Sequence, residues 1–395
     1  MSTILVINSG SSSLKYQLID AEVEEVLASG LVERVGETTG TATHHGPAES
    51  HDRDLAVADH AAAFAAMRDA FDEHGPSLAD HPPIAIGHRV VHGGVRYIEP
   101  TIVTDVVKSD IADLAELAPL HNPANLEGII AAEGLFADIP HVAVFDTAFH
   151  QTLPPAAFTY AIDAELAERQ RVRRFGFHGT SHRFVSRAAA EFLGRPLGEV
   201  KQIVLHLGNG ASACAVDGGR SIETSMGMTP LEGLVMGTRS GDIDPAVLFY
   251  LHRKTGMDFG ELEDLLNRRS GLVGLSGHND MRDVHDAAAS GDHAAQLAFD
   301  VYVHRLTHYI GGYFAQLGRL DALVFTAGVG ENSPEVRARA VEGLGGLGIR
   351  LDLARNAAQS HLPRRISTDD SPVAVLVVPT NEELEIARQT LSVVR

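Results

Sequence analysis

Apolar segments broken by short polar and glycine-rich stretches recur along the chain and predict strands that alternate with helices. Residues 4–7 form an apolar run that leads into Asn8-Ser9-Gly10 and a second β-type segment ending near residue 20. The same pattern returns in residues 204–207, which lead into Gly208-Asn209-Gly210 and another β-type segment. Each copy is typical of a β-hairpin, because Gly and Asn tolerate the positive φ of a tight turn.

Other stretches complete the alternation of strands and helices. Apolar residues at helical spacing over residues 54–74 predict a helix that Gly75-Pro76 ends, and the Gly-, Thr- and His-rich residues 36–52 predict a loop or an irregular hairpin. The remaining predicted elements are strands over 84–91, 141–146 and 323–326 and helices over 109–117, 246–255 and 293–317. The whole pattern predicts an α/β architecture of layered sheets and helices.

The size of the chain and the two hairpins together indicate a duplicated fold. At 395 residues the chain exceeds what one hydrophobic core usually supports, so two domains are expected. One hairpin lies in each half, and the small side chains of both turns let an anion approach the backbone N–H groups. The pair predicts that a polyphosphate is held from both sides, whereas either copy alone is more typical of an ordinary hairpin.

The charge balance excludes several classes of partner. The chain carries 32 basic and 52 acidic side chains, a formal net charge of −20, which disfavours binding to nucleic acid or to an anionic membrane. An anionic substrate must then be bound by a local cluster of Arg, Lys or His. No apolar run is long enough for a membrane span, and no signal peptide is evident. The single cysteine, Cys214, is expected to be a buried small side chain, which fits a cytoplasmic protein.

A glycine turn is predicted after the strand at 323–326. Gly328 and Gly330 flank Val329, and Ser333 precedes Pro334, a typical N-cap followed by Pro at the first helical position. Backbone N–H groups at such a turn and helix start can bind a nucleotide phosphate. The segment lacks the third glycine of a dinucleotide fingerprint and the Gly-Lys-Ser/Thr of a P-loop. It therefore disfavours a Rossmann dehydrogenase and gives, taken alone, weak support for nucleotide binding.

Six sequence blocks, in the same order, resemble those of the acetate kinases, within the superfamily of acetate and sugar kinases, Hsc70 and actin. The resemblance runs from Asn8 to Glu383, and its blocks are NSGSSSLK at 8–15, HRVVHGG at 88–94, FDTAFH at 145–150, RFGFHGTSH at 174–182, TRSGD at 238–242 and FTAGVGEN at 325–332. It implies two duplicated RNase H-like domains with the active site in the cleft between them. The first domain would span 1–150, completed by a C-terminal helix at 384–395, and the second, nucleotide-binding domain would span 151–383.

The resemblance also implies the reaction. It is the reversible, Mg²⁺-dependent transfer of the γ-phosphoryl group of ATP to acetate, which gives acetyl phosphate and ADP, with Mn²⁺ as an alternative metal. Members of the family are usually homodimers. A propionate or other short-chain carboxylate kinase is the alternative within the family, because one methylene changes binding in an apolar pocket by only ~1–3 kcal/mol. A non-catalytic nucleotide switch, as in actin or Hsc70, would lack a clamp for a carboxylate.

The same resemblance assigns roles to individual residues. Three residues are implied to be catalytic: Asp146, His178 and Arg239. Arg89 is implied to bind the carboxylate or phosphate of the substrate, and a small pocket for the acetate methyl group is implied to be lined by Val91, Leu120, Phe177 and Pro230. The residues implied to bind ATP are Lys15, His206, Leu207, Gly208, Asn209, Gly210, Asp280, Met281, Arg282, Gly328, Val329, Gly330, Glu331 and Asn332. Asn8 and Glu382 are implied to hold the metal, and His121 is a further candidate for the catalytic site.

The chemistry of five of these residues can be argued from their positions. Arg89 and Arg239 each lie at a glycine-containing strand-end turn, where a guanidinium fork can bind phosphate or carboxylate, although a single Arg is more often part of a surface ion pair. His178 is expected in an exposed turn after an apolar strand. Asp146 ends a buried strand and is expected to orient Arg239 or a metal-bound water, because a carboxylate substrate has no proton to remove at neutral pH. Glu382 is either a metal ligand or an acid at the start of the final helix.

Overall fold

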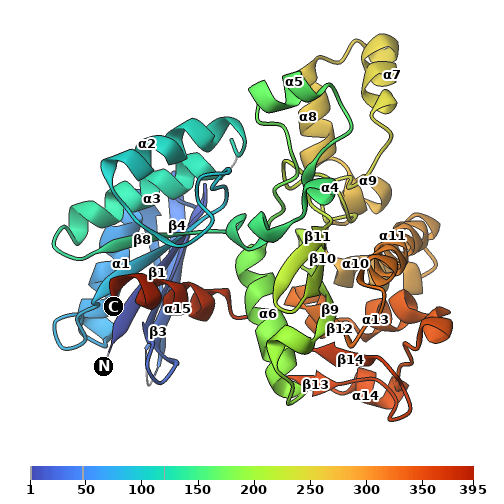
Figure 1. The fold of residues 1–395 in the computed structure, drawn as a ribbon. Coiled ribbons are helices and arrows are strands. Elements are labelled where there is room, and N and C mark those ends of the chain that lie inside the picture. The colour runs from blue at the N-terminus through green and yellow to red at the C-terminus, as the bar shows by residue number, and fades with distance from the viewer. Residues whose placement is uncertain (1, 47–48, 120) are drawn as a thin grey trace. The chain divides into compact units, whose positions relative to one another are not determined.

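The computed structural model describes residues 2–46, 49–119 and 121–395, and the chain divides into two compact units (Figure 1). Unit 1 comprises Met1–Ala148 and Asn381–Arg395, and unit 2 comprises Phe149–Thr380. The chain therefore leaves unit 1 once and returns to it for its last helix, which is drawn in red beside the blue strands in Figure 1. Within the described residues, no helix is both long and apolar enough to cross a membrane.

The described residues of unit 1 contain a mixed sheet in the order β5-β4-β3-β2-β1-β6-β8-β7. Its strands are β1 (Thr3–Ser9), β2 (Ser13–Asp20), β3 (Glu25–Glu33), β4 (Glu37–His45), β5 (Ser50–Val57), β6 (Ala85–Val90), β7 (Thr101–Ile102) and β8 (His141–Phe145). Strands β1 to β5 form successive antiparallel pairs, whereas β6 pairs parallel to β1 and β8 parallel to β6. The first predicted hairpin is therefore present as β1 and β2.

Helices cover both faces of this sheet. They are α1 (His60–His74), α2 (Asp105–Asp113), α3 (Asn122–Leu135) and α15 (Glu382–Val394), with a 3-10 turn at Leu114–Glu116. Ile86 of β6 belongs to the core that α1 and α3 close, while a side chain at the next residue, Gly87, would collide with Thr390 of α15. Because successive strand residues face opposite sides, α15 covers the face away from α1 and α3.

The described residues of unit 2 repeat this plan. Its sheet has the order β11-β10-β9-β12-β14-β13, formed by β9 (Lys201–Leu207), β10 (Ala211–Asp217), β11 (Arg220–Thr224), β12 (Ala322–Thr326), β13 (Arg364–Arg365) and β14 (Ala374–Val377). In each unit, three antiparallel strands are followed by two parallel ones, so that β3-β2-β1-β6-β8 corresponds to β11-β10-β9-β12-β14. The duplicated, RNase H-like α/β fold is therefore confirmed, together with both predicted hairpins.

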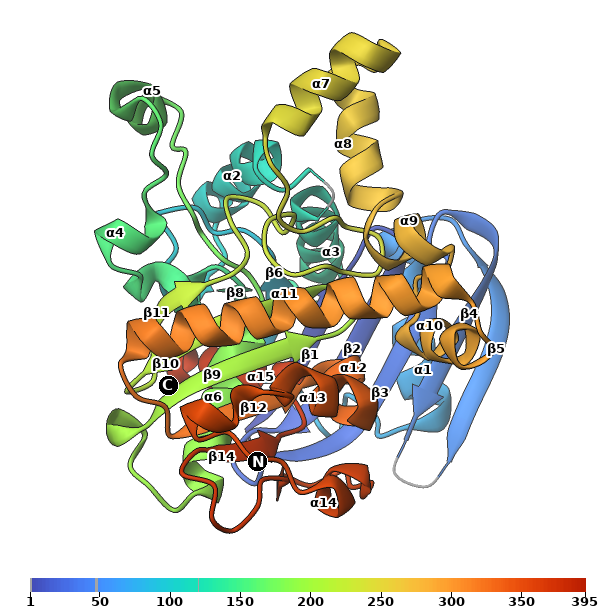
Figure 2. The ribbon, with the colours of Figure 1, turned by 90° about the vertical axis from the view of Figure 1, so that its right-hand side faces the viewer.

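Two long helices, α6 (Gly179–Phe192) and α11 (His293–Leu317), pack on the sheet of unit 2. Val185 of α6 joins the core formed by Val204 and Val324, and Figure 2 shows α11 crossing in front of β9 and β10. The other helices are α4 (Pro155–Phe158), α5 (Ala164–Arg169), α7 (Ala246–Thr255), α8 (Phe259–Arg268), α9 (Gly271–Ser276), α10 (Met281–Ala289), α12 (Ala327–Asn332), α13 (Pro334–Val341) and α14 (Leu353–Ala357). The 3-10 segments are Ala148–Thr152, Leu197–Glu199 and Leu344–Leu347.

The start of α1 was predicted wrongly. A helix was expected from residue 54, but β5 continues to Val57 and α1 begins only at His60. Of the two alternatives for residues 36–52, a loop or an irregular hairpin, the hairpin is formed, by β4 and β5. The Asp59 side chain accepts a hydrogen bond from the Ala62 N–H and caps the helix there. Likewise α2 begins at Asp105, four residues before its predicted start, because Thr104 caps it.

The glycines of the two hairpin turns do not have the predicted conformation. Gly10, Gly208 and Gly210 all avoid positive φ. These glycines therefore matter because they lack side chains and leave space above the backbone. They do not supply a left-handed backbone. A Cβ at Gly10 would lie 3.3 Å from Ser13 Oγ, which is close but short of a collision.

The predicted turn after β12 is also different. Gly328 and Gly330 lie inside the short helix α12, and the left-handed residue is Ala327 before them, with a φ of 63°. Ser333 caps the following helix α13 by accepting a hydrogen bond from the Val336 N–H, as predicted. The segment is thus two consecutive helices and not a glycine loop followed by one.

Candidate active site

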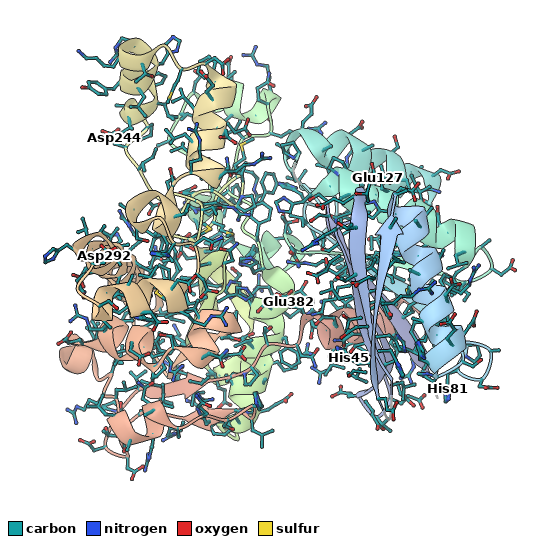
Figure 3. The ribbon with its side chains drawn as sticks, turned by 180° about the vertical axis from the view of Figure 1, so that it is seen from behind. His45, His81, Glu127, Asp244, Asp292 and Glu382 are labelled. Carbon is teal, nitrogen blue, oxygen red and sulfur yellow. The ribbon has the colours of Figure 1, made fainter. Side chains whose placement is uncertain are left out.

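Three charged residues of unit 1 lie together at one edge of its sheet. Arg89 is near the end of β6, Asp146 directly follows the parallel strand β8, and Glu382 begins α15, where Figure 3 labels it. Asp146 Oδ2 accepts hydrogen bonds from Arg89 Nε at 3.0 Å and from Nη2 at 2.7 Å, while Nη1 lies 3.6 Å from Glu382 Oε2. Asp146 thus holds Arg89, and its expected action on Arg239 or on a metal-bound water stays a prediction.

Burial sets the electrostatics of this cluster. The Asp146 side chain is 1% exposed and the Arg89 side chain 19%, so each charge depends on the other for compensation. Burial acts to lower the pKa of Arg89, but the neighbouring carboxylates, led by Asp146, outweigh it and raise the pKa. Burial raises the pKa of Glu382, and two nearby carboxylates add to the rise. Glu382 therefore carries its negative charge at a free-energy cost that a bound cation would relieve.

Asn8 and Lys15 pair with each other across the first hairpin. Because β1 runs parallel to β6, Asn8 lies at the same sheet edge as the end of β6. Lys15 Nζ contacts Glu383 Oε1 at 2.5 Å, and the Asn381 side chain caps α15 by accepting a hydrogen bond from the Leu384 N–H at 3.0 Å. The cap places Glu382 and Glu383, at the start of α15, at this edge.

Two buried asparagines of α3, which the sequence did not indicate as functional, fix the backbone around the cluster. Asn125 Nδ2 donates to Ser9 O at 2.7 Å, and its Oδ1 accepts from the Val91 N–H at 3.0 Å. Asn122 exchanges two hydrogen bonds with the backbone of His92, at 3.1 and 3.0 Å. These bonds tie the ends of β1 and β6 to α3. The sequence signal that could have identified the two asparagines is their spacing, three residues apart on an otherwise apolar helix.

The unit 1 cluster offers oxygen donors but no complete cage for a metal. Among the residues that the structure describes, no group of three or more His, Cys, Asp or Glu side chains is arranged to hold an ion. The Glu382 carboxylate and the Asn8 amide oxygen are donors of the type that Mg²⁺ uses, and Mg²⁺ usually completes its shell with phosphate oxygens and water. The donor set therefore fits a magnesium ion that binds together with a nucleotide.

In unit 2, two of the predicted catalytic residues flank the turn of the second hairpin. A Cβ at Gly210 would lie 3.5 Å from His178 Nε2 and 3.7 Å from Arg239 Nη1. The turn is closed by a hydrogen bond from the Gly208 N–H to Gly210 O at 3.0 Å. The space above Gly210 therefore lies between an imidazole and a guanidinium, and it suits a group that accepts hydrogen bonds and carries negative charge.

Arg239 is half-buried, and in the described part of the chain no carboxylate lies within 4.0 Å of its guanidinium. Its Nη1 donates to Pro230 O at 3.2 Å and contacts Met236 Sδ at 3.8 Å. Burial lowers the pKa of Arg239. A guanidinium that is partly withdrawn from water without a counter-ion costs free energy, so this position indicates a binding site for an anion.

The loop that carries Arg239 is held by the start of α9. The Leu272 N–H donates to Met236 O at 2.9 Å. Gly271, with a φ of 63°, permits this approach, because a Cβ there would lie 2.2 Å from Met236 O. A strand-end position was expected for Arg239, which is wrong, since the residue lies in the irregular segment between β11 and α7.

His178 occupies a left-handed backbone position, with a φ of 55°, at the N-cap of α6. The strand expected before it is not formed, because residues 170–178 are irregular. Its Nδ1 lies 2.9 Å from Ser212 Oγ, and its ring stacks on that of His206 with centroids 4.2 Å apart. His206 is buried in β9, where its Nδ1 bonds Ser181 Oγ at 2.8 Å, so it contacts His178 and does not line the cavity described next.

A cavity of about 660 Å³ adjoins the second hairpin within unit 2. Eight residues predicted to bind ATP line it: Gly208, Asn209, Asp280, Met281, Arg282, Gly328, Val329 and Asn332. Its other lining residues were not predicted: Gly237, Leu272, Asn279, His285, Asp286, Tyr302, Ser333 and Glu335. The volume is in the range of small-molecule sites. Asn279 and Ser333 directly neighbour predicted residues in the sequence, and that adjacency was the signal available for them.

The remaining residues predicted to bind ATP do not line this cavity: Lys15, His206, Leu207, Gly210, Gly330 and Glu331. Glu331 turns toward the backbone, where its Oε1 accepts hydrogen bonds from the Ala327 N–H at 2.8 Å and the Thr380 N–H at 3.2 Å. At the cavity wall, Asp280 Oδ2 accepts a hydrogen bond from Arg282 Nη2 at 2.6 Å. The hydrogen bonds from Arg282 lower the pKa of Asp280 to about 2.

The residues predicted to line the acetate pocket are divided between the units. Val91 follows β6 in unit 1 and is almost fully buried, and Phe177, which is also buried, lies in unit 2. Pro230 of unit 2 offers its carbonyl as a hydrogen-bond acceptor. Leu120 lies outside the described residues, and the further candidate His121 is at the N-cap of α3 in unit 1.

Relatives of known name match the whole chain. The model of the acetokinase family matches residues 3–388. A protein of Leifsonia xyli subsp. xyli named acetate kinase is 70% identical over 394 residues, which cover 100% of this chain and 99% of the relative. A protein of Streptomyces griseus subsp. griseus, also named acetate kinase, is 58% identical over 395 residues, which cover 99% of this chain and 96% of the relative.

Two solved structures share the fold. The acetate kinase of Porphyromonas gingivalis has a TM-score of 0.94 at 40% sequence identity, with full coverage of both chains. A propionate kinase of Francisella tularensis subsp. tularensis also has a TM-score of 0.94, at 41% identity, and the match covers 99% of this chain and 100% of that one.

Proposed function

The chain belongs to the acetokinase family, and we propose that it transfers the γ-phosphoryl group of ATP reversibly to acetate, which gives acetyl phosphate and ADP. The observation that carries this proposal is Arg239, whose half-buried guanidinium has no carboxylate within 4.0 Å among the described residues. A phosphate beside the second hairpin would supply the missing negative charge.

The nucleotide is proposed to occupy the cavity of unit 2, with its phosphates at the second hairpin. Gly208 and Asn209 belong both to the hairpin turn and to the cavity wall, so one ligand reaches from the wall to the turn. Tyr302 supports a polar ligand, because its hydroxyl is buried at this wall and no described residue forms a hydrogen bond with it. A buried hydroxyl without a partner costs free energy that a ligand atom would recover.

Phosphoryl transfer depends on positioning and on neutralising charge at the equatorial oxygens of the transferred group. Arg239 and His178 flank the space above Gly210, so they are proposed to hold those oxygens. A guanidinium supplies two parallel donors to a phosphoryl group, which a Lys would not. Arg239 would therefore act mainly in the transition state, when charge spreads over the transferred group.

Arg89 is proposed to bind the carboxylate of acetate, and Asp146 to position Arg89. Two guanidinium nitrogens are already bonded to Asp146, so the orientation of the fork is fixed before the substrate arrives. Acetate is already deprotonated at neutral pH, so the carboxylate of Asp146 has no proton to take. Val91, which directly follows β6 at this edge of unit 1, is proposed to contact the acetate methyl group.

Asn8 and Glu382 are proposed to hold Mg²⁺, with Mn²⁺ as the alternative ion. When bound, the ion would supply positive charge to the phosphate oxygens. Glu382 contributes its carboxylate, and α15, capped by Asn381, keeps that carboxylate in place. Lys15, bonded to Glu383, adds a second positive charge to this edge of unit 1.

A propionate kinase, or a kinase of another short-chain acid, is the second candidate. The observation that favours it is the propionate kinase with a TM-score of 0.94, which resembles this chain as closely as the Porphyromonas gingivalis acetate kinase does. An apolar pocket distinguishes acids that differ by one methylene by only about 1–3 kcal/mol. Turnover of both acids is therefore compatible with the main proposal.

The chain is also proposed to form a homodimer in the cytoplasm. Helices α7 and α8 expose Phe249 (57%), Tyr250 (55%) and Phe259 (77%), and α7 buries none of its residues. A second copy that covers this helix pair would remove the apolar surface from water. Cys214 is the single cysteine and is buried, which is typical of a reducing compartment.

The direct test is a hydroxamate assay for acyl phosphate, with ATP, Mg²⁺ and either acetate, propionate or butyrate. The proposal predicts product with acetate and loss of product in excess chelator. Product with propionate or butyrate but not with acetate would favour the second candidate. Absence of product with all three acids would contradict both.

A further inference from the structure

The side chain of Ser212 lies between two histidines of unit 2. Its Oγ is 2.9 Å from His178 Nδ1 and 2.8 Å from His182 Nε2. Ser212 is fully buried in β10, while His178 is the N-cap of α6 and His182 lies in its first turn. A hydroxyl has one hydrogen, so Ser212 can donate to only one of the two rings, and accepting from both would leave its buried O–H without an acceptor among the described residues.

The surroundings of His182 decide which way the Ser212 hydroxyl points. Burial, with His150 and His206 adding to it, holds the pKa of His182 well below its usual value, so the ring carries a single proton. His182 Nδ1 is buried without a hydrogen-bond partner among the residues that the structure describes. An N–H buried there would stay unpaired, which proteins largely avoid. The proton of His182 is therefore on Nε2, where Ser212 Oγ accepts it.

We propose that Ser212 and His182 select the tautomer of His178 in which Nδ1 accepts the Ser212 hydroxyl and the proton is on Nε2. Nε2 is the atom that lies 3.5 Å from the Cβ position of Gly210. An N–H is thus directed into the space where the phosphoryl group binds, and in that respect the inference rests on the proposed function. Ser212 and His182 are positioning residues that act through His178.

Arg239 lies on the other side of this space, where its Nη1 is 3.7 Å from the Cβ position of Gly210. With its proton on Nε2, His178 would donate a hydrogen bond to the same phosphoryl group that the guanidinium binds. The opposite tautomer would turn a lone pair toward the oxygens of a phosphoryl group.

The test that does not depend on activity is NMR of the full chain with ¹⁵N-labelled histidine, without ligands. His178 is assigned by comparison with His178→Gln, and the proposal predicts an unprotonated Nδ1 and a protonated Nε2. Ser212→Ala should give a mixture of tautomers. His182→Gln should keep the selection, because its side-chain amide can still donate to Ser212, whereas His182→Leu should weaken it. A protonated Nδ1 in neutral His178 of the unmodified chain would overturn the proposal, even if Ser212→Ala did not fold.

Kinetics separates positioning from folding. Ser212→Ala should lower kcat by about 10–100-fold, as for other partners that orient a histidine, with little change in the KM for ATP. Ser212→Thr, which keeps the hydroxyl, should recover most of the rate. The matched control is Ser225→Ala, which removes an equally buried hydroxyl that bonds the Ala213 N–H and forms no hydrogen bond with a histidine in the described part of the chain. Equal losses of kcat in Ser212→Ala and Ser225→Ala would overturn the positioning role. If the unmodified chain showed the predicted tautomer but no kinase activity, only the proposed function would be refuted.

Discussion

Asp146 Oδ2 accepts hydrogen bonds from both Nε and Nη2 of Arg89, at 3.0 and 2.7 Å. A single carboxylate oxygen therefore fixes the plane of the guanidinium, and the 1% exposure of the Asp146 side chain keeps water from competing for it. The relationship explains how an acid can matter to a kinase whose substrate has no proton to lose. Asp146 would act by holding Arg89.

Asp146→Asn should weaken this hold without removing it. The Asn oxygen still accepts a hydrogen bond, but a charge-assisted bond worth about 1.5–3 kcal/mol is lost. We therefore expect kcat/KM for acetate to fall about 10–100-fold, while the KM for ATP changes little. Steady-state kinetics over a pH series checks this. An acid limb in the pH profile that the substitution abolishes would instead indicate proton transfer by Asp146.

Arg239→Ala should separate activity from stability. We expect kcat to fall by roughly 10³–10⁵-fold, as when an arginine that stabilises phosphoryl transfer is lost, and Arg239→Lys to recover little of it. The same substitution removes a half-buried charge that has no carboxylate within 4.0 Å among the described residues. The free energy of unfolding should then rise by about 0.5–2 kcal/mol. Denaturant unfolding that shows a clear loss of stability would contradict this description of the Arg239 environment.

Gly210→Ala should fill the proposed phosphoryl site without disturbing the fold. The new methyl group would lie 3.5 Å from His178 Nε2 and 3.7 Å from Arg239 Nη1, which is ordinary van der Waals contact, and the backbone of Gly210 does not require glycine. Thermal unfolding should be nearly unchanged, whereas kcat should fall by about 10-fold or more. Gly346→Ala is the control, because a Cβ there meets nothing within 4 Å. Unchanged kinetics in Gly210→Ala would remove this space from the site.

Glu382→Gln should alter the pH dependence of stability. Burial raises the pKa of Glu382, so the folded chain holds a proton that the unfolded chain has lost. Stability linked to this proton is present below the unfolded pKa of roughly 4.3 and is lost as pH rises through the folded pKa. The variant should therefore be more stable than the unmodified chain at pH 8, and the difference should narrow toward pH 5.

Urea unfolding at several pH values, without divalent metal, measures this difference. Glu263→Gln, at an exposed position on α8, is the control and should show no such trend. If Glu382 is also a metal ligand, Glu382→Gln should require more Mg²⁺ for half-maximal activity. A difference between Glu382→Gln and the unmodified chain that grows as the pH falls would contradict the raised pKa.

The fold could be predicted where its signals are local. The hairpins of β1–β2 and β9–β10 were recognised because apolar runs on both sides of a glycine turn are a short-range pattern. The hairpin of β4 and β5 could be predicted only as one of two alternatives, a loop or an irregular hairpin, because most of its residues are polar, and in β4 only Gly40 and His44 are buried. Such a strand forms through pairing with its neighbours, which the composition of the segment does not report.

Residue types and the family resemblance predicted which residues form the site, but not the surroundings of those residues. The sequence indicated Arg239 and His178, but not that Arg239 has no carboxylate within 4.0 Å among the described residues or that His178 has a left-handed backbone. Ser212 is 34 residues from His178 and 30 from His182, so their contact depends on how β10 packs on α6. Contacts between separate elements of the fold decide these properties, and no local pattern encodes them.

The measurement that tests the central claim most directly is ³¹P NMR of ATP and acetate incubated with the protein and Mg²⁺. The predicted result is the joint appearance of ADP and acetyl phosphate in equal amounts, with neither formed by the Arg239→Ala variant on the same timescale. ADP accompanied only by inorganic phosphate, or no loss of ATP at all, would contradict the claim that this chain transfers the γ-phosphoryl group to acetate.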